Sequence, residues 1–406
     1  MFNLEQLSKI RFGMSEVPKH GGQRGDYEEK WSQWFLERSF FRDFVYRNPR
    51  GKRKGEELAD AVTLFGDVAI MTQVKAQHGR RDPLLWAEEK LKEAFRQLKN
   101  THDDLYQGRI KKLTNDCYGE IAFDATHYPN RFGIIILAHD SPPYLAAELV
   151  PEILTASFPI HVFSLRDFGM IAARFDTAGD LITFLEMRGD VAARERLLVQ
   201  EEAANIERMI PQIKGILRSH MSPTTEEVLD RTVRSIEQTA TGELLNSPDW
   251  RYGLAIDDMI ARAHDRDQEL EWNQRSNGPK GSLEVARYFG WLTRDRRIWL
   301  GRKIIAKCTE AKDGELHYFR HIQPSRGASC VYLVTSQSRP ERIKTLRYLV
   351  GYAYTRPGIR QCVGVATEPI GNGRSYDFYA PQHPPRAAVL DKLKEMGNPF
   401  SSDELV

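Results

Sequence analysis

The hydrophobic pattern of the N-terminal half alternates between helical and strand-like segments. Residues 27–41 carry aromatic and aliphatic side chains at helical spacing, which predicts an amphipathic helix. Residues 58–65 and 68–76 are two apolar runs rich in β-branched side chains, and Gly66-Asp67 separates them. Because a two-residue turn that begins with Gly favours a tight reversal, these runs are expected to form a β-hairpin.

Four further segments extend this pattern. A short strand is expected over 43–49, a charged helix over 84–100, and buried strands over 132–140 and 160–165. The resulting order is helix, strand, hairpin, helix, strand, strand. It predicts an α/β sandwich with a mixed central sheet flanked by helices.

The C-terminal half begins with helical periodicity and then returns to an α/β pattern. Strand-like runs at 329–336 and 361–369 enclose an amphipathic helix at 340–354, which predicts a parallel βαβ unit. We therefore expect a flexible lead-in over 1–24, an α/β domain over 25–190, a helical connector over 191–281, and a second, smaller α/β domain over 282–406.

Polar side chains interrupt the apolar hairpin at one end. Counting back from Gly66-Asp67 sets Asp60 opposite Gln73, and Lys75 emerges two residues later on the same face. Burying a carboxylate, an amide and an ammonium within an apolar sheet costs free energy unless other interactions compensate it. Their convergence therefore indicates a functional site, although an edge Asp and a solvated strand end are the plainer alternatives.

The composition limits which classes of protein are possible. The chain has 406 residues, 41% of them hydrophobic, and a formal net charge of +2, so nucleic-acid binding would depend on local basic patches. No apolar run approaches bilayer length, and MFNLEQLSKIRFG lacks the apolar core of a signal peptide. The four cysteines form no CxxC pair, which argues against a zinc site and a disulfide scaffold and favours a reducing cytoplasm.

Twelve residues separate Asp60 from the segment Gln73-Val74-Lys75. This spacing resembles the signature of the PD-(D/E)xK nucleases. The match is to the variant in which Gln replaces the second acid, as in Mrr-like restriction endonucleases. The resemblance covers roughly residues 25–190 and implies a restriction-endonuclease-like fold. It further implies metal-dependent hydrolysis of DNA, in preference to RNA, in bacterial restriction or anti-phage defence.

The resemblance also assigns roles to residues. Asp60, Gln73 and the backbone carbonyl of Val74 would hold Mg²⁺ or Mn²⁺, because hard oxygen ligands suit these ions. Lys75 would act on the attacking water or on the charge of the phosphorane. Gln73 carries no charge, so weaker metal affinity than with Glu is expected.

Three more residues are candidates by their position in such a fold. Glu29 on the first helix and Glu57 just before the hairpin could add carboxylates to the metal site, and Gln97 on the following helix could present its amide to the site. The alternatives are a surface helix Glu, a loop carboxylate and an exposed helix Gln.

A basic segment precedes the hairpin and is a candidate phosphate-binding loop. It contains Arg47, Arg50, Lys52, Arg53 and Lys54 without an acid among them. Contact with a DNA backbone is expected here, and a solvated charged face is the alternative.

Two other functions remain open. The uncharged Gln73 leaves room for a catalytically weak or inactive nuclease-fold module that binds or regulates nucleic acid. The C-terminal half shows no catalytic constellation, so it could mediate homo-oligomer or partner-protein contacts. No membrane association is expected.

Overall fold

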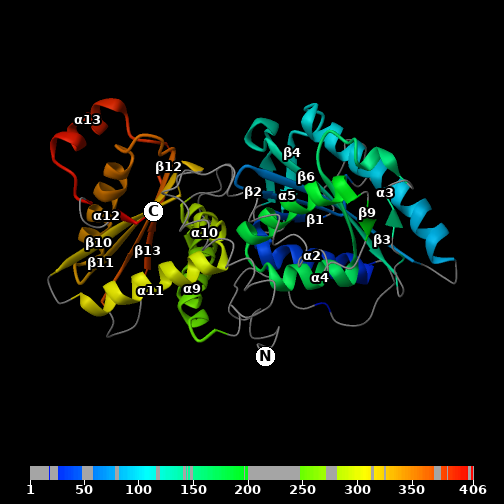
Figure 1. Cartoon of the computed structure of the whole chain (residues 1–406). Helices are drawn as coiled ribbons and strands as arrows, with labels where there is room; N and C mark the ends of the chain where they lie inside the picture. The colour runs from blue at the N-terminus through cyan, green and yellow to red at the C-terminus, as the bar shows by residue number, and fades with distance from the viewer. Residues whose placement is uncertain are drawn as a thin grey trace. The chain divides into compact units, whose positions relative to one another are not determined.

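The structure is a computed structural model of the chain (Figure 1). It describes residues 18, 26–47, 58–77, 82–115, 119–139, 143, 145–146, 150–195, 197–199, 247–270, 281–311, 315–323, 326–369, 376–381, 383–400 and 404–405. The chain divides into two compact units. The first holds the described residues from 18 to 199, Ser247 and Thr293–Asp295, and the second holds the other described residues from Pro248 onward.

The first unit is built on a five-stranded mixed sheet in the order β1-β2-β3-β6-β8. These strands are β1 (Val45–Arg47), β2 (Ala61–Phe65), β3 (Val68–Ala76), β6 (Asn130–Ala138) and β8 (Ile160–Ser164). Strand β2 is antiparallel to β1 and β3, whereas β3, β6 and β8 are parallel. The expected α/β class with a mixed central sheet is therefore confirmed.

The hairpin forms in the register that the sequence predicts. Phe65 lies opposite Val68 and Ala61 lies opposite Thr72. Gly66 has a φ of 61°, a conformation that residues with a Cβ rarely adopt. The turn therefore fixes which side chains of the two strands share a face.

Helices cover both faces of this sheet. Helix α3 (Pro83–Tyr106) packs Leu91 and Leu98 into a core that includes Met71 and Ile135. Its first turn is capped by Asp82, whose carboxylate accepts hydrogen bonds from the backbone of the first turn. The aromatic side chains at the end of α2 (Asp26–Phe40) pack instead against Phe65, whose side chain points to the opposite face of the sheet.

Helix α4 (Leu165–Arg174) lies beside α2, as Figure 1 shows, and α5 (Ala178–Glu195) follows it. Two hydrogen bonds hold α2 to the end of α4. Arg38 donates to the carbonyl of Ala173 at 3.3 Å, and the Ser39 hydroxyl donates to the carbonyl of Phe175 at 3.2 Å.

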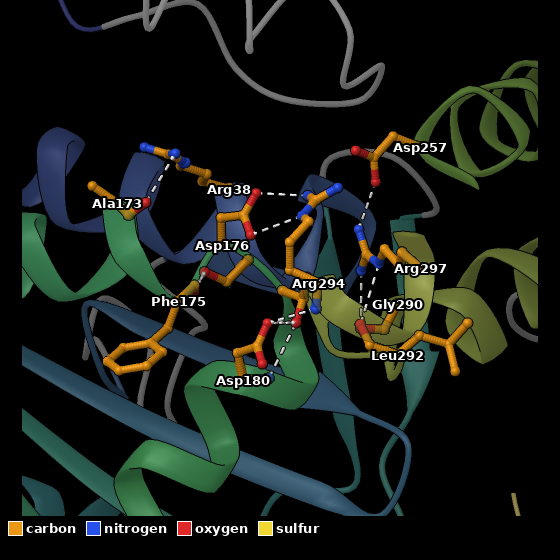
Figure 2. A network of polar contacts seen from close by, with 12 residues as sticks. Arg38, Ala173, Phe175, Asp176, Asp180, Asp257, Gly290, Leu292, Arg294 and Arg297 are labelled. Carbon is orange, nitrogen blue, oxygen red and sulfur yellow. Dashed lines mark hydrogen bonds and ion pairs between the residues drawn. The ribbon is translucent and has the colours of Figure 1, made fainter. Parts of the chain in front are cut away.

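A fully buried ion pair belongs to the same unit (Figure 2). The guanidinium of Arg294 contacts both carboxylate oxygens of Asp176, at 3.2 and 2.6 Å. The backbone N–H of Arg294 donates to Asp180 at 2.9 Å. Burial is the largest cause that raises the pKa of Asp180, to about 6. The segment Thr293–Asp295 therefore completes the first unit from far along the chain.

The second unit contains a five-stranded sheet in the order β13 (Tyr376–Tyr379), β12 (Gln361–Thr367), β11 (Ala328–Thr335), β10 (Leu316–Gln323) and β14 (Glu404–Leu405). Strands β11 and β12 are parallel and are joined by helix α12 (Arg339–Ala353), so the expected parallel βαβ unit is confirmed. Gly364 allows α12 to approach closely, because a Cβ there would lie 2.6 Å from the Val350 side chain.

Helix α9 (Trp250–Leu270) belongs to the second unit, whereas the sequence pattern assigned its residues to the connector. It packs against α10 (Ser282–Gly290), and this contact explains the assignment. In the same unit Arg297 pairs with Asp257 at 2.7 Å (Figure 2). Among the described helices, none is both long and apolar enough to cross a membrane.

The other elements of the two units have the following bounds. They are η1 (Arg42–Phe44), β4 (Lys112–Asn115), β5 (Gly119–Ala122), η2 (Ala125–His127), β7 (Leu145–Ala146), η4 (Pro151–Ile153), β9 (Leu197–Val199), α11 (Arg294–Glu310) and α13 (Ala387–Glu395). The β4–β5 hairpin between α3 and β6 was not predicted from the sequence.

Candidate active site

Asp60 lies immediately before β2, near the carboxyl end of β3. Its carboxylate accepts a hydrogen bond from the backbone N–H of Val74 at 2.5 Å. Its own carbonyl accepts a hydrogen bond from the side-chain amide of Gln33, on α2, at 3.2 Å. One further step of the hairpin register sets Asp60 beside Gln73. Asp60 is therefore held between α2 and the Gln73-Val74-Lys75 segment.

Lys75 is bound by a residue of α3. Its Nζ lies 3.2 Å from Oε1 of Glu93, so the Lys75 side chain is on the α3 face of the sheet. Strand alternation sets Gln73, which is buried, on that same face. The pKa of Glu93 is lowered, first by a hydrogen bond from Lys90 and, against the opposing effect of burial, by Lys75. The carboxylate form of Glu93 is thereby favoured.

Gln97 faces the same region from α3. Helical spacing sets Glu93, Gln97 and Thr101 on one stripe, and each end of the stripe has a known contact. Glu93 reaches Lys75, and the Thr101 hydroxyl donates to the carbonyl of Leu58, two residues before Asp60. The Oε1 atom of Gln97 is buried and has no hydrogen-bond partner among the described residues. Gln97 thus offers an oxygen on the side of the sheet predicted to carry the site.

Helix α2 presents a second polar stripe, in which residues recur every fourth position. Glu37 is fully buried and forms an ion pair with Arg47, with the guanidinium Nε at 3.0 Å. Gln33 contacts Asp60, and Glu29, which is half-buried, lies one turn earlier on the same face. The helix therefore directs Glu29 toward the end of the sheet at which Asp60 lies.

For several predicted residues, the structure shows no contact with the candidate site. Glu57, Arg50, Lys52, Arg53 and Lys54 lie outside the described residues, as do the lead-in over 1–24 apart from Pro18 and most of the connector. Arg47 is described, and its guanidinium is engaged by Glu37. Phosphate binding by the basic loop stays a prediction.

The oxygen donors around Asp60 limit how tightly a divalent metal could be held. In the described part of the chain, no group of three His, Cys, Asp or Glu side chains is arranged to hold an ion. The candidate oxygen ligands are the Asp60 carboxylate, the side-chain amide oxygens of Gln73 and Gln97, and the Val74 carbonyl, with Glu29 as the candidate for a second carboxylate. Mg²⁺ is commonly held by one or two carboxylates and keeps several waters. The residues therefore fit a weakly held, largely hydrated Mg²⁺ or Mn²⁺, and they do not form an all-protein cage.

Sequence reasoning missed Glu93 and Gln33. Both are polar helix residues that contact the hairpin only after the helices pack on opposite faces of the sheet. One signal was present: Glu93 lies four residues before Gln97, so the two share a helix face.

Sequence reasoning also missed a cavity of about 530 Å³ in the first unit. It is lined by α2, by α4, and by the residues that follow β3 and β6. Pockets at the carboxyl ends of parallel strands are a common location for ligands in open α/β sheets.

Comparison of the chain with models of known protein families, with curated proteins and with solved structures finds no match.

Proposed function

We propose that the first unit hydrolyses phosphodiester bonds of DNA with a divalent metal, in the manner of a PD-(D/E)xK nuclease. One observation carries the proposal. The Asp60 carboxylate is hydrogen-bonded at 2.5 Å to the amide of Val74, the residue between Gln73 and Lys75. The three side chains of the motif are thereby brought to one end of the hairpin.

The topology supports a restriction-endonuclease-like fold. The sheet begins with an antiparallel segment, β1-β2-β3, and continues with parallel strands β6 and β8. Helices pack on both faces, and the motif lies on the central hairpin. Apart from the added β4–β5 hairpin, the elements follow the order that the hydrophobic pattern predicts.

The metal would be held by the Asp60 carboxylate, the Gln73 amide oxygen and the Val74 carbonyl. Glu29 is positioned to add a second carboxylate, and Glu57 stays a further candidate from the sequence. When bound, the ion supplies positive charge that polarises the phosphate and lowers the pKa of a bound water. Gln97 is a positioning residue in this proposal, because its amide faces the same end of the sheet.

Lys75 would donate hydrogen bonds to the attacking water or to a non-bridging phosphate oxygen. The water oxygen would bond to phosphorus, and the bond from phosphorus to the leaving sugar oxygen would break. The water proton would pass to solvent, and the leaving oxygen would take up a proton from solvent. The ammonium of Lys75 stabilises the negative charge on the phosphorane. Glu93 holds that ammonium in place at 3.2 Å.

A catalytically weak or inactive nuclease-fold module is the second candidate. It is favoured by the neutral Gln73 and by the ion pair with Glu93, which already neutralises the charge of Lys75. In either case we propose a role in bacterial restriction or anti-phage defence in a reducing cytoplasm. The second unit would regulate or recruit the first, through a partner protein or a second copy of the chain.

The test is incubation of the full chain with plasmid, linear duplex and single-stranded DNA, and with RNA, in Mg²⁺ or Mn²⁺. Wild type should cut DNA, and Lys75→Ala should not. Lys92→Ala is a matched control, because Lys92 is exposed on α3 and pairs with Glu88. Equal cleavage by wild type and Lys75→Ala would reject the proposal. Absence of cleavage with either metal, without rescue by Gln73→Glu, would favour the inactive module.

A further inference from the structure

The cavity of about 530 Å³ in the first unit has an aromatic wall. Tyr27, Trp31 and Phe35 line it from α2. The ring centroids of Trp31 and Phe35 are 5.5 Å apart, and those of Tyr27 and Trp31 are 6.2 Å apart. Gln77, after β3, and Arg166, at the start of α4, add polar groups to the lining. The volume lies in the range of small-ligand pockets.

The cavity lies on the α2 side of the sheet, at the carboxyl ends of β3 and β6, whereas Lys75 of the candidate active site lies on the α3 side of the same strand end. Along β3, Lys75 contributes to the site and Gln77, two residues later, lines the cavity. Along α2, Gln33 contacts Asp60, whereas Trp31 and Phe35 face the cavity. Neighbouring faces of one helix therefore serve the two features.

Gly169 shapes this wall. A Cβ at Gly169 would lie 2.6 Å from Cζ of Phe35, so only glycine allows the Phe35 ring to rest against α4 in this position. Glycine is unfavourable within a helix compared with alanine. Its presence in α4 is explained by the close approach of the ring.

The polar groups of the cavity restrict its ligand. Arg166 forms no ion pair with any described residue, and the indole N–H of Trp31 is buried without a described hydrogen-bond partner. A purely apolar ligand would leave the buried N–H of Trp31 without a partner and would not use the exposed guanidinium of Arg166. An inorganic anion would leave the aromatic wall unused. A nucleotide supplies a base that stacks on aromatic rings and a phosphate that attracts a guanidinium.

We infer that this pocket receives one unstacked nucleotide of the DNA strand that is cut, with its base against Trp31 and Phe35 and a phosphate toward Arg166. The inference rests on the proposed function and specifies its substrate class. A base within an intact duplex is stacked and must be extruded before it can enter such a pocket. Single strands, flaps and gaps are therefore preferred over continuous duplex.

Binding of oligonucleotides to the full chain without metal tests the inference. Fluorescence anisotropy would compare a 5′-labelled single strand, the same sequence as a duplex, and a single strand of the same length with abasic sites. The intact single strand should bind roughly 10-fold or more tighter than the abasic strand, since base stacking on aromatic side chains contributes on that order. Equal affinity for the intact and abasic strands would overturn the inference.

Two variants link this preference to the pocket. Gly169→Ala should push the Phe35 ring into the cavity and reduce the affinity for the intact strand toward that for the abasic strand. Arg166→Gln should make the salt dependence of single-strand binding shallower by about 0.7 in log–log slope. It should also reduce the ratio of the affinities for the intact and abasic strands, because the contact with the phosphate that orients the base is lost. If Gly169→Ala does not fold, Arg166→Gln decides the question.

Arg96→Gln is the matched control, because Arg96 is an exposed cation of α3 and does not line the cavity. It should leave the intact-to-abasic ratio unchanged. A ratio that changes equally in Arg96→Gln and Arg166→Gln, or in neither, contradicts the inference.

Two further arms separate the possible failures. Base-dependent binding that the pocket variants abolish, in a protein that cuts no DNA, would retain the pocket and reject the nuclease. Cleavage with no dependence on the base would reject the pocket alone. Titration with free deoxyadenosine monophosphate that binds more tightly than the strand would identify a free nucleotide as the occupant and overturn the inference.

Discussion

The ammonium of Lys75 lies 3.2 Å from the carboxylate of Glu93, so the cation of the candidate motif is held by a helix outside that motif. Lys90 also donates to Glu93, at 2.7 Å. These contacts keep the pKa of Glu93 below its usual value. The position of Lys75 therefore depends on how α3 packs on the sheet.

Replacing Glu93 should change catalysis more than DNA binding. In Glu93→Gln, Lys75 loses its ionic partner, and we expect kcat to fall roughly 10–100-fold with little change in KM, because small displacements of a reacting group are costly. Glu93→Asp should recover part of the rate. Glu88→Gln, which removes an exposed α3 carboxylate paired with Lys92, is the control. Equal kcat in wild type and Glu93→Gln would show that the ion pair has no role in positioning.

The activity should also depend on pH through this pair. The lowered pKa of Glu93 means that the folded protein keeps the carboxylate charged to a lower pH than an isolated Glu would. The ion pair is thus present above the ordinary Glu pKa and is lost as the pH falls through the lowered value. In Glu93→Gln, the acid limb of the kcat profile should lose this contribution. Superimposable acid limbs for the two proteins would contradict the assignment.

Substitutions in the predicted metal site should separate binding from fold. Asp60→Asn retains an oxygen that can accept the Val74 N–H, so the hairpin should remain folded while cleavage is lost. Gln73→Glu adds a negative charge beside the ion and should tighten Mg²⁺ binding at least about tenfold, or ~1.4 kcal/mol. Calorimetric titration with Mg²⁺ and Mn²⁺ measures this. Unchanged metal affinity in Gln73→Glu would show that residue 73 is not a ligand.

The buried Arg294–Asp176 pair should be a major contributor to the stability of the first unit. Arg294→Ala leaves a buried carboxylate without its cation, and the free energy of unfolding should fall by about 3–5 kcal/mol. The exposed pair between Arg302 and Asp249 is the comparison, and Arg302→Ala should cost about 0–1 kcal/mol. Urea unfolding checks both values. A fragment that ends near residue 190 lacks Arg294. By the same reasoning, it should be less stable than the full chain.

Asp180 predicts a pH dependence of stability. Its pKa is raised to about 6 in the folded protein, above an unfolded value of about 4. The folded state therefore holds the proton more tightly, so this group stabilises the fold below about pH 4, and that contribution is lost as the pH rises to about 6. The change is on the order of 2–3 kcal/mol. Asp180→Asn keeps an acceptor for the N–H of Arg294 and should remove this slope from urea unfolding curves recorded across that pH window. An unchanged slope would exclude Asp180 as its source.

The basic loop can be tested without Arg47, which pairs with Glu37. Neutral replacement of Arg50, Lys52, Arg53 and Lys54 should weaken duplex binding. The slope of log K against log salt should become shallower by up to about 0.9 per lost phosphate contact. A slope equal to that of wild type would assign the loop to a solvated face.

The sequence by itself determined the hairpin and the parallel βαβ unit. Gly66-Asp67 set the turn, and period-two alternation then specified the faces of β2 and β3, because a tight turn leaves no freedom of register. The spacing of Asp60, Gln73 and Lys75 followed directly from that register. These are local relationships, encoded within a few residues of the turn.

Only the tertiary structure decided what surrounds the motif. Glu93 meets Lys75, Gln33 meets Asp60, and Arg294 meets Asp176 across long separations in the chain. The aromatic cavity exists because Gly169 lets Phe35 approach α4, and α9 joins the second unit because it packs on α10. Helical periodicity shows which residues share a face, but the partner of that face is selected by side-chain packing between distant segments, and hydrophobic patterning alone does not specify that choice.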